Sequence, residues 1–186
     1  MVVTPAGIGH NGGPEMSGVA WRTHCWKTAR ETLLPTLPIE VVRLRVRRAQ
    51  ELGLEYKTYA GIRATTGRDL IAFLFSSNAL GLHRGRDLTG QVQDRLTRMK
   101  QVGKIGLSVA PLTPDQLLTL APMLDQSHPA PRPFAEFAEA RQVLRAATGA
   151  IPSDAVLLIG SHGGEADWCA TARFAGYLSA DRFFAA

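Results

Sequence analysis

The stretch Ala155-Val-Leu-Leu-Ile159, followed by Gly160-Ser-His-Gly-Gly-Glu165, decides the fold class of this chain. Five continuous apolar residues bounded by turn residues predict a short, fully buried strand. The glycine-rich segment after it predicts a tight turn, and a helix is expected from about residue 165 to residue 178. A buried strand that leads through a turn into a helix is typical of α/β folds.

A second strand is predicted over residues 104–110, where Ile105, Leu107 and Val109 alternate with smaller or polar residues. Helices are expected over 113–124 and 134–148, with a proline-rich connection between them. The order of strand, helices, strand and helix predicts an α/β (or α+β) fold, in which residues 104–186 form a small unit of few strands.

The front of the chain is expected to be a basic helical unit over residues 19–103, packed with that α/β unit and preceded by a disordered tail at 1–18. Residues 70–75 fit either a helix or a buried strand, because length and pattern do not decide between them. Thr66-Gly-Arg-Asp69 resembles a capping box, so a helix continuing to residue 80 is favoured. The other helices are predicted over residues 19–33, 39–52, 56–64 and 91–102.

No apolar run in the chain approaches the roughly 18 residues needed to cross a bilayer. The N-terminus lacks the charged and apolar regions of a signal peptide, and Cys25 and Cys169 form no CxxC pattern. These features predict a cytoplasmic protein with no membrane partner. No set of residues has metal-ligand spacing, and no cofactor is predicted.

The N-terminal string Gly7-Ile-Gly-His-Asn-Gly-Gly-Pro14 is distinctive. It resembles the tails near the start of many small, largely uncharacterised bacterial proteins, some of them phage-related. The resemblance covers residues 7–14 and implies a bacterial accessory or mobile-element protein. It implies no activity.

Charge divides the chain into two unlike parts. Residues 1–105 hold sixteen Lys/Arg and eight Asp/Glu, whereas residues 106–186 hold five and eight. An anionic partner would therefore meet the first part, and nucleic acid is the leading candidate because Lys and Arg neutralise phosphates. The alternative is an ordinary solvated basic face. The predicted nucleic-acid-binding residues are Arg43, Arg45, Arg47, Arg48, Lys57, Arg63 and Arg68.

The turn after residue 159 is the second candidate site, comprising Gly160, Ser161, His162, Gly163 and Gly164, with Ser76-Ser-Asn78 as possible neighbours. Amides in such a turn bind anions, and ligands of α/β sheets lie at strand carboxyl ends. Against an anion, Glu165 is expected to compete for the same amides. The alternative is a structural turn that needs positive φ at glycine.

A Cys–His pair is the third candidate. A helix N-terminus lowers a thiol pKa, so Cys169 would be the nucleophile and His162 its base. The alternative is that Cys169 belongs to the core.

Three functions follow from these patterns. The first is a bacterial accessory or regulatory protein that contacts nucleic acid through its basic helices. The second is a small ligand-binding protein or enzyme with its site at residues 160–169. The third is a protein-interaction or structural module that contacts another protein. The residues favour a non-enzymatic role.

Overall fold

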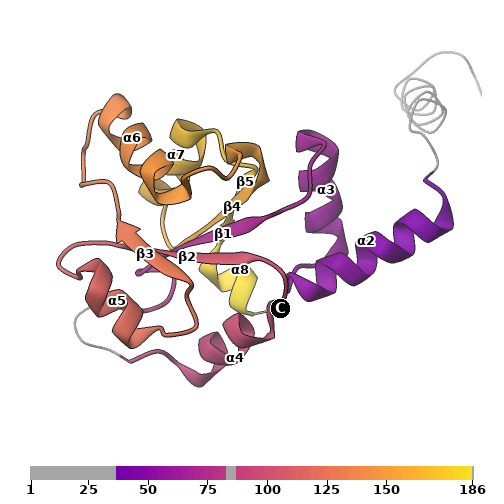
Figure 1. The fold of residues 1–186 in the computed structure, drawn as a ribbon, viewed down its shortest axis with the longest axis horizontal. Helices are drawn as coiled ribbons and strands as arrows, with labels where there is room; N and C mark the ends of the chain where they lie inside the picture. The colour runs from indigo at the N-terminus through magenta and orange to yellow at the C-terminus, as the bar shows by residue number, and fades with distance from the viewer. Residues whose placement is uncertain (1–36, 83–86, 186) are drawn as a thin grey trace, which may run out of the picture. The chain divides into compact units, whose positions relative to one another are not determined.

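Five parallel strands form one sheet in this computed structural model, which describes residues 37–82 and 87–185 (Figure 1). The strand order is β3-β2-β1-β4-β5, and every neighbouring pair is parallel. The predicted α/β fold is confirmed. The strands are β1 (Ala72–Ser76), β2 (Gly103–Ser108), β3 (Gln126–Pro129), β4 (Val156–Gly160) and β5 (Gly176–Ser179).

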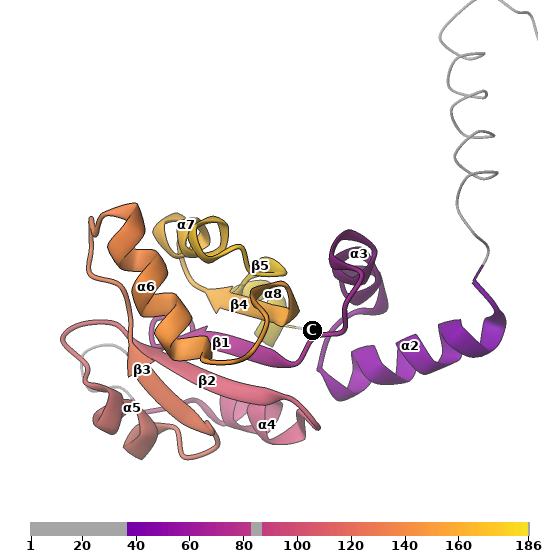
Figure 2. The same ribbon diagram turned by 45° about the horizontal axis from the view of Figure 1, so that its top comes forward.

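Helices cover both faces of the sheet, as Figure 2 shows. One apolar cluster joins α2 (Ile39–Glu51), α3 (Tyr56–Thr66), α4 (Gly90–Arg98), α5 (Pro114–Leu120) and α8 (Ala180–Phe184) to one face. A second cluster joins α6 (Phe137–Thr148) and α7 (Gly163–Ala172) to the other. The chain divides into residues 1–41 and 42–186, and the whole sheet belongs to the second unit.

The central position of β1 explains why the pattern of residues 70–75 fits both a helix and a buried strand. Phe73 and Phe75 pack in the first cluster, whereas Ala72 and Leu74 pack in the second. All five residues of β1 are buried. A parallel strand covered on both faces is a continuous apolar run, which carries no alternation to distinguish it from a buried helix.

The helix favoured over residues 70–80 is therefore wrong, and the misleading signal was the supposed capping box. Thr66 is the last residue of α3, and Gly67 closes that helix in the left-handed conformation, with φ of 71°. The Asp69 carboxylate accepts from Leu70 N–H at 2.9 Å and from the Tyr59 hydroxyl at 2.7 Å. The segment is a helix end and a turn into β1.

The strand predicted over residues 155–159 is confirmed as β4, and the strand predicted over residues 104–110 is confirmed as β2. Two edge strands were missed: β3 lies in the expected connection, and β5 lies in the expected last helix. That helix ends at Ala172, where Arg173 turns the chain with φ of 57°. The helices predicted at 91–102 and 113–124 are shorter than expected, and a further short helix, η1 (Ser153–Ala155), precedes β4.

The two regions expected on either side of residue 103 share this sheet, because β1 pairs with both β2 and β4. The tail at 1–18 and the helix at 19–33 lie outside the described residues. Within the described part of the chain, no helix combines the length and apolarity that crossing a bilayer requires.

Candidate functional site

The strand order reverses between β1 and β4. From β1 the chain moves outward through β2 to β3, and it then crosses back to β4 and continues to β5. In open α/β sheets, the crevice at the carboxyl ends of the strands beside such a reversal is where ligands bind. Here β1 ends in Ser76 and continues into Ser77 and Asn78, while β4 ends in Gly160 and continues into Ser161 and His162.

A buried carboxylate joins the two strand ends. Glu165, on the first turn of α7, is 0% exposed. Its Oε2 accepts from the Ser76 hydroxyl at 2.9 Å and from Ser161 N–H at 2.6 Å. Its Oε1 accepts from Asn78 Nδ2 at 2.9 Å and lies 3.4 Å from His162 Nε2. The predicted competition of Glu165 for turn amides is thus confirmed at Ser161.

Ser77 makes the matching connection on the other side of β1. Its N–H donates to Leu107 O at 2.9 Å, and its Oγ accepts from Val109 N–H at 3.0 Å. The Ser76-Ser77 pair therefore ties β1 to β4 and α7 on one side and to the end of β2 on the other. Serine hydroxyls are suited to this because each both donates and accepts.

Close packing, rather than backbone conformation, explains the first glycine of the turn. A Cβ at Gly160 would lie 2.6 Å from Tyr177 Cε2 and 2.8 Å from Glu165 Oε2, whereas one at Gly163 would meet nothing within 4 Å. The expected positive φ in this turn is wrong: the described glycines with positive φ are Gly53, Gly67, Gly81 and Gly149.

Two hollows adjoin at this edge of the sheet. The larger, of about 700 Å³, includes His162, Trp168 and Phe137 in its lining. The smaller, of about 660 Å³, includes Asn78 and Leu112, and Val109 lines both. Asn78 Nδ2 and His162 Nε2 are 3.5 Å apart, so the two hollows meet across this pair. Each has the volume of a site for a small organic molecule.

The Tyr177 hydroxyl contacts the start of α7 at this edge. Burial raises the pKa of the Tyr177 hydroxyl, and the charges of Glu165 and Asp181 raise it further. That hydroxyl donates to His162 O at 3.3 Å, which fixes the backbone at the start of α7.

The Cys–His pair does not form as predicted. Cys169 lies in the later turns of α7, with its Sγ 3.9 Å from Phe174 O. Burial raises the pKa of this thiol, so the predicted lowering is wrong. His162 instead faces Glu165 and Asn78. A core thiol of this kind is a poor nucleophile at neutral pH.

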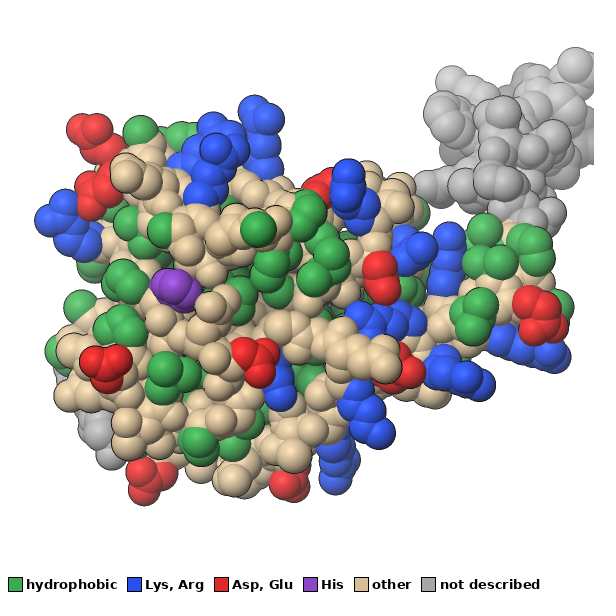
Figure 3. Space-filling model, viewed as in Figure 1, with side chains coloured by type: hydrophobic (Ala, Val, Ile, Leu, Met, Phe, Trp, Pro, Cys, Tyr) green, Lys and Arg blue, Asp and Glu red, His purple; other side chains and the backbone are tan. Residues whose placement is uncertain are grey.

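The seven predicted basic residues separate into two groups. Arg48 and Arg63 both pair with Asp69, at 3.1 and 3.6 Å, and Arg68 pairs with Asp154 at 3.0 Å. Of the others, Arg45 is half-buried, while Arg43, Arg47 and Lys57 are exposed. Figure 3 shows Lys and Arg side chains gathered over and beside α2, at the right of the view.

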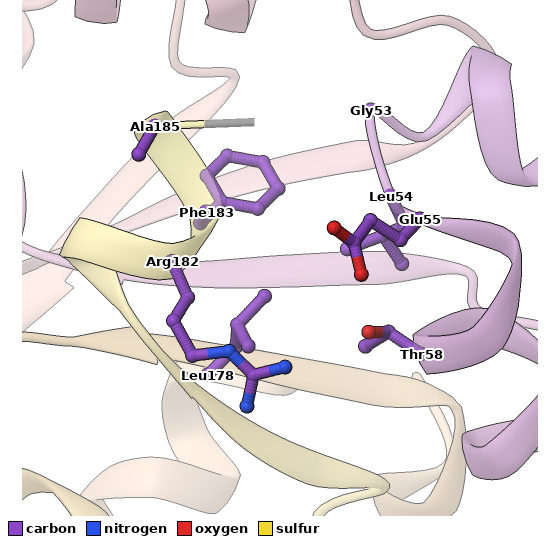
Figure 4. A pocket seen from close by; sticks show the side chains of 8 residues that line it. All are labelled: Gly53, Leu54, Glu55, Thr58, Leu178, Arg182, Phe183 and Ala185. Atoms are coloured by element: carbon purple, nitrogen blue, oxygen red, sulfur yellow. The ribbon is translucent and has the colours of Figure 1, made fainter.

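A smaller hollow of about 240 Å³ lies where α8 meets the turn between α2 and α3. Figure 4 shows the Arg182 guanidinium and the Glu55 carboxylate on opposite sides of it, and Leu178 and Phe183 also line it. It shares no lining residue with the two hollows at the carboxyl edge. In the described residues, no group of three or more His, Cys, Asp or Glu side chains is placed to hold a metal ion.

The sequence predicted a candidate site at the Gly160–Glu165 turn with Ser76-Ser-Asn78 nearby, but nothing in it pointed to Val109, Trp168 or the part of α6 that lines the larger hollow. Only the strand order brings the end of β2 to this edge. Comparison with protein-family models, with curated proteins and with solved structures gives no match for this chain.

Proposed function

We propose that this chain binds a small organic molecule in the crevice at the carboxyl ends of β1, β2 and β4. One observation carries the proposal: two adjoining hollows meet at Asn78 and His162, beside the reversal of strand order. Apolar walls with a few convergent polar groups are typical of ligand sites. The Glu165 carboxylate holds Asn78 and His162 in place for that contact.

A metabolite screen by thermal shift tests this proposal. A ligand at a hundred times its Kd stabilises the fold by about 2.7 kcal/mol. For a chain of this size that raises Tm by roughly 5–10 °C. We expect His162→Ala and Asn78→Ala to lose the ligand-induced rise, and Gln93→Ala, an exposed change on α4, to keep it. A rise of the same size in all four proteins would place the ligand elsewhere.

Contact with nucleic acid through α2 and α3 is the second candidate function, and the exposed basic side chains over α2 support it (Figure 3). It ranks second because Arg48, Arg63 and Arg68 are paired with carboxylates of this chain. Internal pairing reduces the charge that such residues offer to phosphates.

A salt titration of duplex binding tests this second function. We expect the Arg47→Ala and Lys57→Ala double variant to weaken binding to all sequences alike. If both residues contact phosphates, the slope of log K against log salt should flatten by about 1.8. Arg145→Ala, on α6, is the matched control. Absence of any binding by the unaltered protein at low salt would remove this function.

A further inference from the structure

The ligand chemistry of the carboxyl-edge crevice follows from the position of Glu165. In doubly wound folds the phosphates of a bound nucleotide sit at the N-terminus of the helix that follows a strand, on its free amides. In this chain the Glu165 side chain accepts from one amide of the turn after β4, with Oε2 at 2.6 Å from Ser161 N. A phosphate placed there would face a buried carboxylate.

The charged side chains around the two hollows add to this effect. Asp167 lines the larger hollow and Asp115 the smaller. Among their described lining residues there is no lysine, and Arg132 pairs with Glu139 at 2.7 Å. A bound anion would therefore meet two carboxylates and one arginine that is already paired. A neutral or cationic molecule would meet no such repulsion.

Several polar groups that line the two hollows can accept hydrogen bonds from a ligand. Asn78 donates through Nδ2 to Glu165, and its Oδ1 has no hydrogen-bond partner among the described residues. The carboxylates of Asp115 and Asp167 offer further acceptors. These groups fit a ligand that carries N–H donors.

The walls fit a flat ring. Trp168 and Phe137 line the larger hollow, and Phe137 is 62% exposed. Val109 and Leu112 continue the apolar surface into the smaller hollow. An aromatic face buries a planar ring with little loss of side-chain freedom.

We infer that the crevice binds an unphosphorylated, neutral or cationic ring compound with N–H donors, the chemistry of a nucleoside rather than a nucleotide. The inference rests on the proposed ligand-binding function of the crevice. The buried carboxylate of Glu165 has two roles in it: it holds Asn78 and His162, and it rejects a phosphate group.

Matched pairs of nucleoside and nucleoside monophosphate, one pair for each common base, test the inference by calorimetry. At least one nucleoside should bind ten-fold or more tightly than its monophosphate, and His162→Ala should abolish that binding. Equal or tighter binding of the monophosphate would overturn the inference, as would the failure of every nucleoside to bind. The wider proposal of a ligand site falls only if the complete metabolite screen gives no shift that depends on His162.

Glu165→Gln supplies the second measurement, because it removes the charge and keeps the shape. We expect the ratio of nucleoside to monophosphate affinity to narrow at least three-fold in this variant. A merely structural role for Glu165 would weaken both ligands alike and leave the ratio unchanged, which would contradict the inference. If Glu165→Gln does not fold, the ratio of nucleoside to monophosphate affinity in the unaltered protein alone tests the inference.

Discussion

Glu165→Ala should lower the free energy of unfolding by about 2–4 kcal/mol, because it leaves the buried Ser76 hydroxyl and two part-buried donors without an acceptor. The Ser76 hydroxyl, Ser161 N–H and Asn78 Nδ2 all donate to this carboxylate, which is 0% exposed. Glu165→Gln should cost about 1–3 kcal/mol, because its amide nitrogen must face a donor where an oxygen accepted before.

Urea unfolding followed by circular dichroism measures both changes. The matched control is Asp167→Ala, an exposed carboxylate two residues further along α7, which should stay within about 0.5 kcal/mol of the parent. Equal losses for Glu165→Ala and Asp167→Ala would show that the contacts of the buried carboxylate contribute nothing to stability.

Arg48→Ala should have an effect of similar size, about 2–4 kcal/mol, because Arg48 acts inside the molecule. Its side chain is only 18% exposed and pairs with Asp69 at 3.1 Å and Glu51 at 3.4 Å. It also donates to three main-chain carbonyls, those of Leu70, Lys100 and Gln101. One guanidinium thus connects α2 to the start of β1 and to the turn before β2.

Arg48→Lys should recover little of this stability, because a single ammonium cannot reproduce the planar set of donors. Arg47→Ala, one position earlier and exposed, is the control and should change the free energy of unfolding by less than about 0.5 kcal/mol. If the Lys variant matched the parent, charge alone would explain the role of Arg48. Equal effects of Arg47→Ala and Arg48→Ala would contradict its internal role.

The sequence predicted the parts of the fold that local chemistry determines. Continuous apolar residues identified β4, and alternation identified β2. Thr113 caps α5 through the Gln116 amide, as its position before Pro114 suggested. The four-residue edge strands β3 and β5 escaped notice because an edge strand pairs on one side only and needs no strong apolar pattern.

The sequence named both segments of the candidate crevice but not the reason that they are neighbours. Carboxyl ends of parallel strands meet at one edge, which brings Ser76-Ser-Asn78 beside the Gly160–Glu165 turn. The helix favoured over residues 70–80 hid this reason. The pairing of Arg48 with Asp69 was not foreseeable, because the two residues are 21 positions apart and charge composition does not say which charges meet. That pairing is what separates internal from exposed basic residues.

The bond between Ser76 and Glu165 also has a consequence for how the protein reaches its native state. The two residues are 89 positions apart in the chain, and β1 pairs with β4 across a similar distance. Contacts between residues so distant in sequence form slowly, because a long loop must close before they contribute. During synthesis on the ribosome, β1 emerges long before its partner β4. The edge of β1 that pairs with β4 therefore stays unpaired until β4 has been synthesised. We therefore expect the crevice to be among the last features to form, and any folding intermediate that holds only β1, β2 and β3 to expose an uncovered strand to chaperones or to aggregation.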